Sequence, residues 1–402
     1  MGRVSLTPAA KKAVAIGGMC SVAYLAVYLA RNILGTVSPQ MIEDGVFVTE
    51  QIGTLSSIYF ISYALGQLFN GAIGDKIKAK YMISLGLALA GVSNLIFSLG
   101  AGSAAVAYVA YALTGFFLSM IYGPMTKVVA ENTEPVYATR CSLGYTFASF
   151  FGSPLAGVLA ALLAWQGVFA VSSGVLVLMG VVCFSFFHLL ERRGTIKFGE
   201  YKKPEGKGSV GLLIEHRIIK FTFISVLTGV VRTTVVFWLP TYIAQYLGFS
   251  SEASAGIFSA ATFVISLSAF IAVFMYEKLG NNMDLTILIA FSVSSVSFLL
   301  VYLLKAPVPN IIFMVLAILS SNCAASMLWS RYCPSLRDTG MVSGATGFLD
   351  FMSYMAAAAS SSIFANAVEG IGWGNLILVW FGLMVVGVVV ALPWKRKKSP
   401  LI

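Results

Sequence analysis

The sequence predicts an all-α membrane protein with twelve transmembrane helices in two pseudo-symmetric halves of six. Its composition is the first reason: apolar residues make up 58% of the 402 positions and charged residues only 10%. A soluble domain carries about 25% charged residues. The second reason is that the apolar residues come in blocks of about 20, the length that crosses the hydrocarbon core as a helix. The third is an internal repeat, because features of the first half recur in the second.

Twelve apolar blocks define the expected spans. Backbone groups in lipid must hydrogen-bond to one another, so each block is expected to be helical. The blocks cover residues 14–37, 52–74, 81–100, 104–126, 141–164, 167–188, 217–242, 253–275, 285–304, 310–330, 342–366 and 373–393. A polar segment separates the sixth block from the seventh. The predicted domains are therefore a first half, 1–188, a cytoplasmic linker, 189–216, and a second half, 217–402.

The basic residues predict the orientation in the membrane. If both termini are cytoplasmic, 23 of the 26 Lys and Arg residues lie on the cytoplasmic side, as the positive-inside rule requires. The remaining three are Arg31 and Arg232, inside spans, and Lys305, on the outer side. The net charge of +10 is thus mainly a topology signal, and nucleic-acid binding is not expected. We expect a multi-pass protein of the inner or plasma membrane, acting as a monomer.

The two halves repeat at a spacing that grows slowly along the chain. Arg31 and Pro39 recur as Arg232 and Pro240, both at an offset of 201. Three more pairs follow in order, at offsets of 202 to 208: Asp75 with Glu277, Lys127 with Arg331, and Trp165 with Trp373. Parallel repeats of six spans are typical of the major facilitator superfamily, whose substrate site lies between the halves near the middle of the membrane.

The two repeated arginines are the leading candidates for a binding site. A charge in the middle of a membrane helix costs about 2.5–3.5 kcal/mol on insertion scales, so it usually faces a cavity or a partner. The planar fork of donors on arginine suits phosphate or carboxylate. Arg31 and Arg232 are therefore expected to bind an anion. The alternative is that each one extends to the membrane surface or makes a structural ion pair.

Polar side chains continue from these arginines along several helices. Tyr24, Tyr28 and Arg31 share one face of the first helix, at i, i+4 and i+7. Similar stripes on three other helices predict further lining residues. They are Tyr59, Tyr63, Gln67 and Asn70 on the second helix, Ser225, Thr228 and Arg232 on the seventh, and Asp350, Tyr354 and Ser361 on the eleventh. The acid Asp350 has three open roles: counter-ion to an arginine, which we favour, proton-coupling carboxylate, or part of the substrate site.

The loop after the second span carries a recognisable pattern. Gly71-xxx-Asp75-Lys76-x-Lys78-x-Lys80 resembles the facilitator loop signature G-x-x-x-D-R/K-x-G-R/K-R/K, with Lys78 where glycine is usual. Gly71, Asp75 and Lys76 are expected to help control the gate. An ordinary positive-inside loop is the alternative.

The arginine motifs resemble those of the organophosphate:phosphate antiporters, the glycerol-3-phosphate and hexose-phosphate transporter family. Tyr24-xxx-Tyr28-xx-Arg31, with Pro39 ending the helix, is similar to its first helix, and Arg232 with 238–242 (WLPTY) is similar to its seventh, where W-S-P-T-Y follows an arginine. Further likenesses lie at 122–124 (YGP) and 344–347 (GATG). The resemblance implies that the two arginines hold the substrate phosphate.

Three positions depart from the family pattern. Gln67 replaces a lysine, Phe147 stands where the glycerol-3-phosphate members have a histidine, and Asp350 has no counterpart. Tyr145 remains as a site residue in the aromatic stretch of the fifth helix. These changes lower the positive charge of the site and leave phosphate and carboxylate substrates both open.

The sequence therefore predicts a secondary active transporter of small organic anions, with organophosphate/phosphate exchange by alternating access as the leading hypothesis. A proton-coupled transporter of organic carboxylates, such as a sugar acid or dicarboxylate, is the first alternative, and a non-transporting anion sensor the second. No cofactor or metal site is expected. An enzyme is not expected either, because no span holds a nucleophile–base pair, and no ATP-binding loop occurs.

Overall fold

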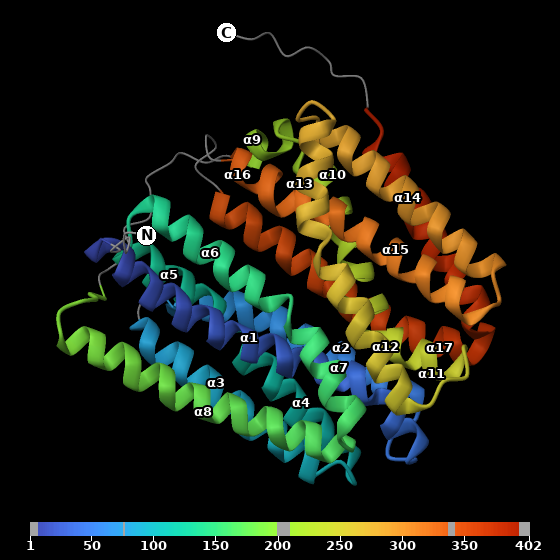
Figure 1. The fold of residues 1–402 in the computed structure, drawn as a ribbon, viewed down its shortest axis with the longest axis horizontal. Helices are drawn as coiled ribbons and strands as arrows, with labels where there is room; N and C mark the ends of the chain where they lie inside the picture. The colour runs from blue at the N-terminus through green and yellow to red at the C-terminus, as the bar shows by residue number, and fades with distance from the viewer. Residues whose placement is uncertain (1–6, 75–76, 199–209, 337–341, 394–402) are drawn as a thin grey trace, which may run out of the picture. The chain divides into compact units, whose positions relative to one another are not determined.

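The computed structural model describes residues 7–74, 77–198, 210–336 and 342–393. The regular structure of these residues is helical throughout, as the sequence predicts (Figure 1).

Eight helices form the first part of the chain. They are α1 (Pro8–Glu43), α2 (Thr49–Gly74), α3 (Ala79–Leu99), α4 (Ala104–Leu118), α5 (Tyr122–Asn132), α6 (Pro135–Ser149), α7 (Gly152–Leu162) and α8 (Trp165–Arg192). The second part contains nine α-helices and two π-helical segments, η1 and η2. These are α9 (Val210–Glu215), α10 (Ile218–Gly229), η1 (Val230–Val235), α11 (Val236–Gln245), α12 (Ser251–Ser266), α13 (Ser268–Lys278), α14 (Met283–Leu303), α15 (Pro307–Met327), η2 (Leu328–Tyr332), α16 (Cys333–Ser335) and α17 (Val342–Ala391).

Ten helical stretches in the described part of the chain are long and apolar enough to cross a membrane. The sequence predicts twelve spans. One of the ten, Ala345–Ala391, covers two predicted spans and kinks at Gly372, whose φ of 76° and ψ of 165° lie outside the helical region. The predicted fifth span is divided between α6 and the short apolar helix α7. The count of twelve accordingly stays a prediction.

Helix α1 continues past Pro39 to Glu43, so the expectation that Pro39 ends the helix is wrong. Proline has no N–H, which leaves the carbonyl four residues earlier without its helical donor. That carbonyl belongs to Gly35, and the Ser38 hydroxyl donates to it at 2.9 Å. Hydroxyl groups commonly replace lost backbone donors in membrane helices, so the helix tolerates the proline.

The described residues form two compact units. Unit 1 contains α1 to α8, together with Val236–Phe263, which holds α11 and most of α12, and Ala357–Glu369, a part of α17. Small residues bring these last two segments close to α1 and α2. The Ser57 hydroxyl donates to the Ala358 carbonyl at 2.6 Å, and Ser38 lies 2.7 Å from the Thr241 hydroxyl. Such close contacts between small residues are typical of packed membrane helices.

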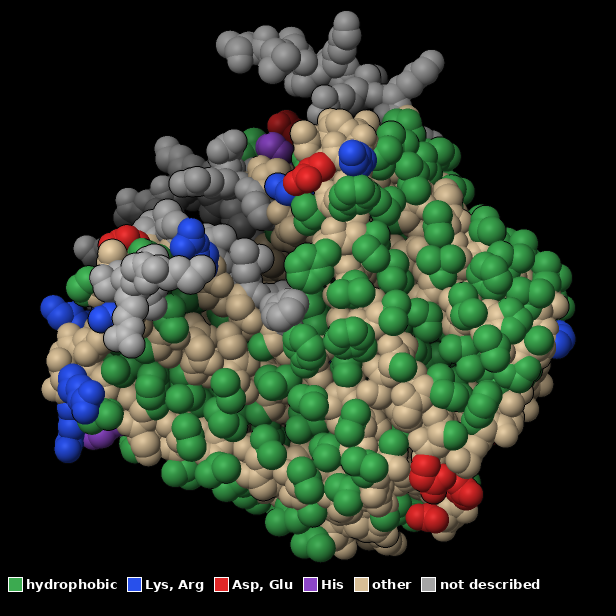
Figure 2. All heavy atoms as spheres, viewed as in Figure 1, with side chains coloured by type: hydrophobic (Ala, Val, Ile, Leu, Met, Phe, Trp, Pro, Cys, Tyr) green, Lys and Arg blue, Asp and Glu red, His purple; other side chains and the backbone are tan. Residues whose placement is uncertain are grey.

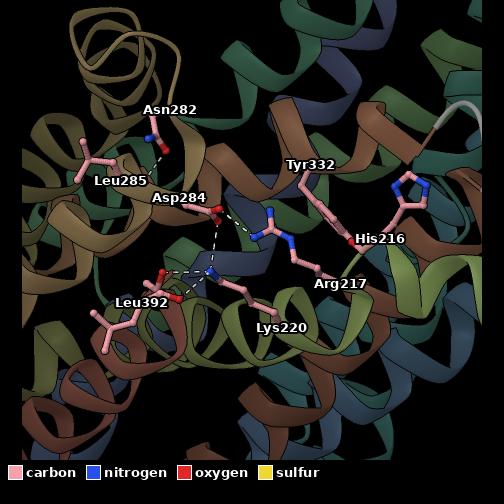
Figure 3. A network of polar contacts seen from close by, with 9 residues as sticks. His216, Arg217, Lys220, Asn282, Asp284, Leu285, Tyr332 and Leu392 are labelled. Atoms are coloured by element: carbon pink, nitrogen blue, oxygen red, sulfur yellow. Dashed lines mark hydrogen bonds and ion pairs between the residues drawn. The ribbon is translucent and has the colours of Figure 1, made fainter. Parts of the chain in front are cut away.

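Unit 2 contains α9, α10, η1, α13 to α16, η2 and most of α17. An ion-pair network ties three of its helices together (Figure 3). The Asp284 carboxylate at the start of α14 accepts hydrogen bonds from Arg217 at 2.9 Å and from Lys220, on α10, at 3.2 Å. The Lys220 amine also donates to the Ala391 carbonyl at the end of α17, at 3.0 Å. The network therefore fixes one end of the unit.

The surface is largely apolar. Figure 2 shows hydrophobic side chains over most of the face in view, with the few charged side chains near its margins. Large apolar side chains such as Leu99, Leu162 and Val308 are 66–80% exposed, which a soluble protein of this size would avoid over so wide an area. The exposed apolar surface agrees with contact to lipid.

Candidate functional site

The arginine of unit 1 lies among aromatic rings. Arg31 is half-buried on α1, and its Cζ is 5.4 Å from the ring centre of Tyr28, 5.3 Å from that of Tyr63 and 5.7 Å from that of Phe60. All three distances are within the range at which a ring attracts a cation. Two helices supply the rings, because Phe60 and Tyr63 belong to α2. The first arginine thus has an aromatic environment built from its own helix, α1, and from α2.

The predicted aromatic face of α1 extends to two other helices. Tyr24 contacts Tyr28 at a ring-centre distance of 5.0 Å and meets Tyr145 of α6 edge-on at 5.8 Å. Tyr122, at the start of α5, lies 5.5 Å from Tyr24 and 6.1 Å from Tyr145. Tyr24 and Tyr145 are buried, whereas Tyr122 is exposed. The structure therefore brings Tyr24, Tyr28 and Tyr145 together around the face of α1 that leads to Arg31.

The polar residues along α2 differ in burial: Tyr59, Tyr63 and Asn70 are buried, whereas Gln67 is half-buried. Tyr59 is buried and lies 5.0 Å from the ring of Tyr111, so it packs against α4. Asn70 donates from its amide to the Ser119 hydroxyl at 2.8 Å. Gln67 lies one turn beyond Tyr63 and is half-buried. Within this stripe, the Tyr63 ring lies beside the guanidinium of Arg31.

The arginine of unit 2 lies in an unusual backbone. Arg232 is half-buried in the π-helical segment η1, and its Cζ is 5.9 Å from the ring centre of Trp329 in the other π-helical segment, η2. Earlier residues of the predicted polar stripe serve packing: the Ser225 hydroxyl donates to the Leu349 carbonyl and the Thr228 hydroxyl to the Ile224 carbonyl, both at 2.7 Å. Within the described residues, the second arginine thus has one aromatic neighbour, and its helix is not regular.

The two predicted site residues of α17 are placed differently from each other. Tyr354 is buried. Asp350 is half-buried and lies within electrostatic range of the Cys333 thiol. Asp350 therefore lies near the start of α16.

The predicted loop motif is only partly described. Gly71 belongs to the last part of α2, while Asp75 and Lys76 lie outside the described residues. The lysines that follow are anchored to the end of α8. Lys78 pairs with Glu191 at 2.7 Å, and the buried Lys80 amine contacts the other oxygen of the same carboxylate. The hydrogen bond to Glu191 holds the pKa of the Lys78 amine above its usual value.

Three aromatic residues that lie beside predicted site residues were not themselves predicted: Phe60 beside Arg31, Tyr122 beside Tyr24 and Trp329 beside Arg232. Tyr122 stands in a motif that resembles the antiporter family, so the sequence held a usable signal for it. Phe60 precedes Tyr63 by three residues, a spacing that places both on one helical face. No pattern in the sequence marks Trp329, because its position depends on two π-helical segments.

Comparison with known proteins identifies the family. The model of the Major Facilitator Superfamily matches residues 20–361. The phosphoglycerate transporter protein of Salmonella typhimurium is 24% identical over 90% of this chain and 84% of that protein. The membrane sensor protein UhpC of Escherichia coli is 23% identical, and the chain spans 56% of its length. The match to UhpC of Salmonella typhimurium, at 28% identity, spans only 21% of that protein.

A solved structure has the same fold. The bacterial homologue of the human lysosomal transporter Spinster, in an inward-facing and occupied conformation, matches with a TM-score of 0.73. The match covers 96% of this chain and 95% of that one, at 12% identity. Together with the family match over most of the chain, this shows that the protein belongs to the Major Facilitator Superfamily: it is a membrane transporter similar to the organophosphate:phosphate antiporters, not an enzyme.

Proposed function

We propose that this transporter carries small organic anions, exchanging an organophosphate for inorganic phosphate by alternating access. One observation carries the proposal: each unit holds an arginine within a membrane-spanning stretch and lays its guanidinium beside aromatic rings. The similarity to a phosphoglycerate transporter supports phosphate esters as the substrate class. In this proposal Arg31 and Arg232 both bind the anion.

The aromatic neighbours suit an arginine that must bind and release an anion. A ring attracts the cation through its π face and uses none of the guanidinium N–H groups. Those N–H groups form a planar fork that can donate two parallel hydrogen bonds to phosphate or carboxylate oxygens. Ring contacts thus help to retain a charged arginine in a poorly hydrated place, and they do not themselves use its N–H donors.

The topology belongs to the same proposal. Twelve spans in two halves, 1–188 and 217–402, joined by the linker 189–216, give each half one arginine. Basic loops place both termini in the cytoplasm and the protein in the inner or plasma membrane. The two arginines repel each other, and a bound anion would offset this repulsion in the closed state. The loaded protein would then change conformation more readily than the empty one, which favours exchange.

The direct test is an exchange assay on the purified, reconstituted protein. Vesicles loaded with phosphate are expected to take up labelled phosphate from outside, and vesicles without internal phosphate to take up far less. Glycerol phosphate or phosphoglycerate inside should replace internal phosphate. Uptake that is the same with and without any internal anion would contradict exchange.

A sensor is the second candidate, since two relatives are named membrane sensor proteins. A sensor would bind phosphate esters but show no flux in the loaded vesicles. Binding without uptake would therefore replace the transport proposal.

A proton-coupled carboxylate transporter is the remaining alternative, and the half-buried Asp350 is its supporting observation. It predicts that succinate or a sugar acid enters together with protons in weakly buffered vesicles. Asp350→Asn would abolish this proton uptake, whereas in the exchange proposal the variant continues to exchange phosphate.

A further inference from the structure

The two π-helical segments of unit 2 each supply one residue of the contact between Arg232 and Trp329. Segment η1 interrupts the span Ile218–Gln245 and contains Arg232, and segment η2 ends the span Pro307–Tyr332 and contains Trp329. π-helical turns are rare, and they occur frequently at functional sites inside α-helices. Arg232 and its aromatic neighbour Trp329 both lie in such turns. This coincidence indicates that the contact between them is a specific feature of the fold.

The position of η1 has a local cause. The segment begins directly after Gly229, where α10 presses onto α17: an added Cβ at Gly229 would lie 2.2 Å from the Ser353 hydroxyl and 2.9 Å from the Ser353 carbonyl. Apart from Arg232, residues 230–236 (VVRTTVV) are all β-branched. β-branched side chains crowd the preceding turn of an α-helix, which lowers its stability. The α-helix is held firmly up to Gly229 and then loses its regular form.

Segment η2 is fixed at its far end. The Tyr332 ring stacks on Phe221 of α10 with ring centres 3.5 Å apart. The Tyr332 hydroxyl donates to the His216 carbonyl at 3.0 Å (Figure 3). Phe221 and Tyr332 are both buried. Trp329 lies three residues before this anchor and is half-buried. Its indole is therefore held near this anchor through η2 and remains partly exposed.

We propose that Trp329 is a positioning residue for anion binding: its indole holds the guanidinium of Arg232, so that the anion meets donors in a fixed plane. This inference rests on the proposed anion-binding role of Arg232. Contact with a ring face orients the plane of the guanidinium and leaves the N–H groups at its edge available. Without the indole, the long arginine side chain must lose rotamer freedom each time an anion binds.

The test compares two substitutions of Trp329 in the purified full-length protein. Trp329→Phe keeps an aromatic face, whereas Trp329→Met keeps an apolar side chain without a ring. Equilibrium phosphate binding is expected to stay within about threefold of wild type in Trp329→Phe and to weaken roughly tenfold in Trp329→Met. In the exchange assay, Trp329→Met should raise the half-saturating phosphate concentration more than it lowers the maximal rate.

A structural role would give a different pattern. If Trp329 only fills space, both variants should lower the melting temperature without phosphate, and the phosphate affinity of the folded protein should stay at the wild-type value. That result overturns the inference while leaving the proposed function intact. Equal affinity losses in Trp329→Phe and Trp329→Met would also overturn it, because the aromatic face would then not matter.

A ligand titration distinguishes failure of the proposed function from failure of the positioning role of Trp329. All three proteins are titrated with phosphate, glycerol phosphate and succinate. If the wild type binds none of them, the proposed function and this inference both fail. If the wild type binds only succinate and Trp329→Met weakens that binding, the positioning role holds and phosphate is rejected as the substrate.

Discussion

The two arginines are charged residues within apolar helices, and they are stabilised there in different ways. Arg31 lies on a regular α-helix and is close to three rings from α1 and α2. Arg232 lies in a π-helical turn, and in the part of the chain that the structure describes one ring lies close to it. That ring, Trp329, belongs to a second π-helical turn. The first site depends on many side chains and the second on backbone geometry. Substitutions of single side chains should therefore be tolerated better around Arg31.

The largest contrast is expected from two glycines that both press onto α17. A Cβ at Gly53 would lie 2.5 Å from the Ala365 Cβ, and one at Gly229 would lie 2.9 Å from the Ser353 carbonyl. Added volume in a packed interface typically costs 1–3 kcal/mol. Gly53→Ala and Gly229→Ala should each lower the melting temperature by a comparable amount, but Gly229→Ala should also weaken phosphate binding because it displaces the helix that enters η1.

Thermal unfolding and phosphate titration of both variants would measure this contrast. A Gly229→Ala protein with reduced stability and unchanged phosphate affinity would show that the geometry of η1 is not coupled to binding.

A smaller effect is expected from removing single rings near Arg31. Because three rings surround this arginine, Phe60→Leu should weaken phosphate binding by less than about threefold, and the double variant Phe60→Leu/Tyr63→Leu by roughly tenfold, since an aromatic–cation contact contributes about 0.5–1 kcal/mol at such sites. Isothermal titration with phosphate measures both. A single substitution as damaging as the double one would mean that the rings do not share the role.

Much of this organisation could be predicted from the sequence. The blocks of apolar residues located the helices. The spacing of Tyr24, Tyr28 and Arg31 predicted that they share one helical face, and in the structure they lie on a regular part of α1 where the rings of Tyr24 and Tyr28 are in contact. The same reasoning failed where the helix is not regular. An α-helical face through Ser225 and Arg232 assumes 3.6 residues per turn, which η1 does not keep.

Contacts between segments that are distant in the sequence could not be predicted either. Trp329 lies beside Arg232 because η2 is anchored on α10, and no periodicity within either helix reveals that pairing. The continuation of α1 beyond Pro39 likewise depends on a hydroxyl group, that of Ser38, which hydrogen-bonds the orphaned carbonyl. Local pattern thus predicts which segments are helices, while tertiary contacts decide where helices deform.

Equilibrium binding of labelled phosphate to the purified protein tests the central claim most directly, that one arginine in each unit binds the anion. Lysine keeps the charge but lacks the planar fork, so Arg31→Lys and Arg232→Lys should each weaken binding at least tenfold. The matched controls Arg140→Lys and Arg331→Lys change exposed arginines that also lie over tyrosine rings, and they should bind as the wild type does. Wild-type affinity in either Arg31→Lys or Arg232→Lys would contradict the account.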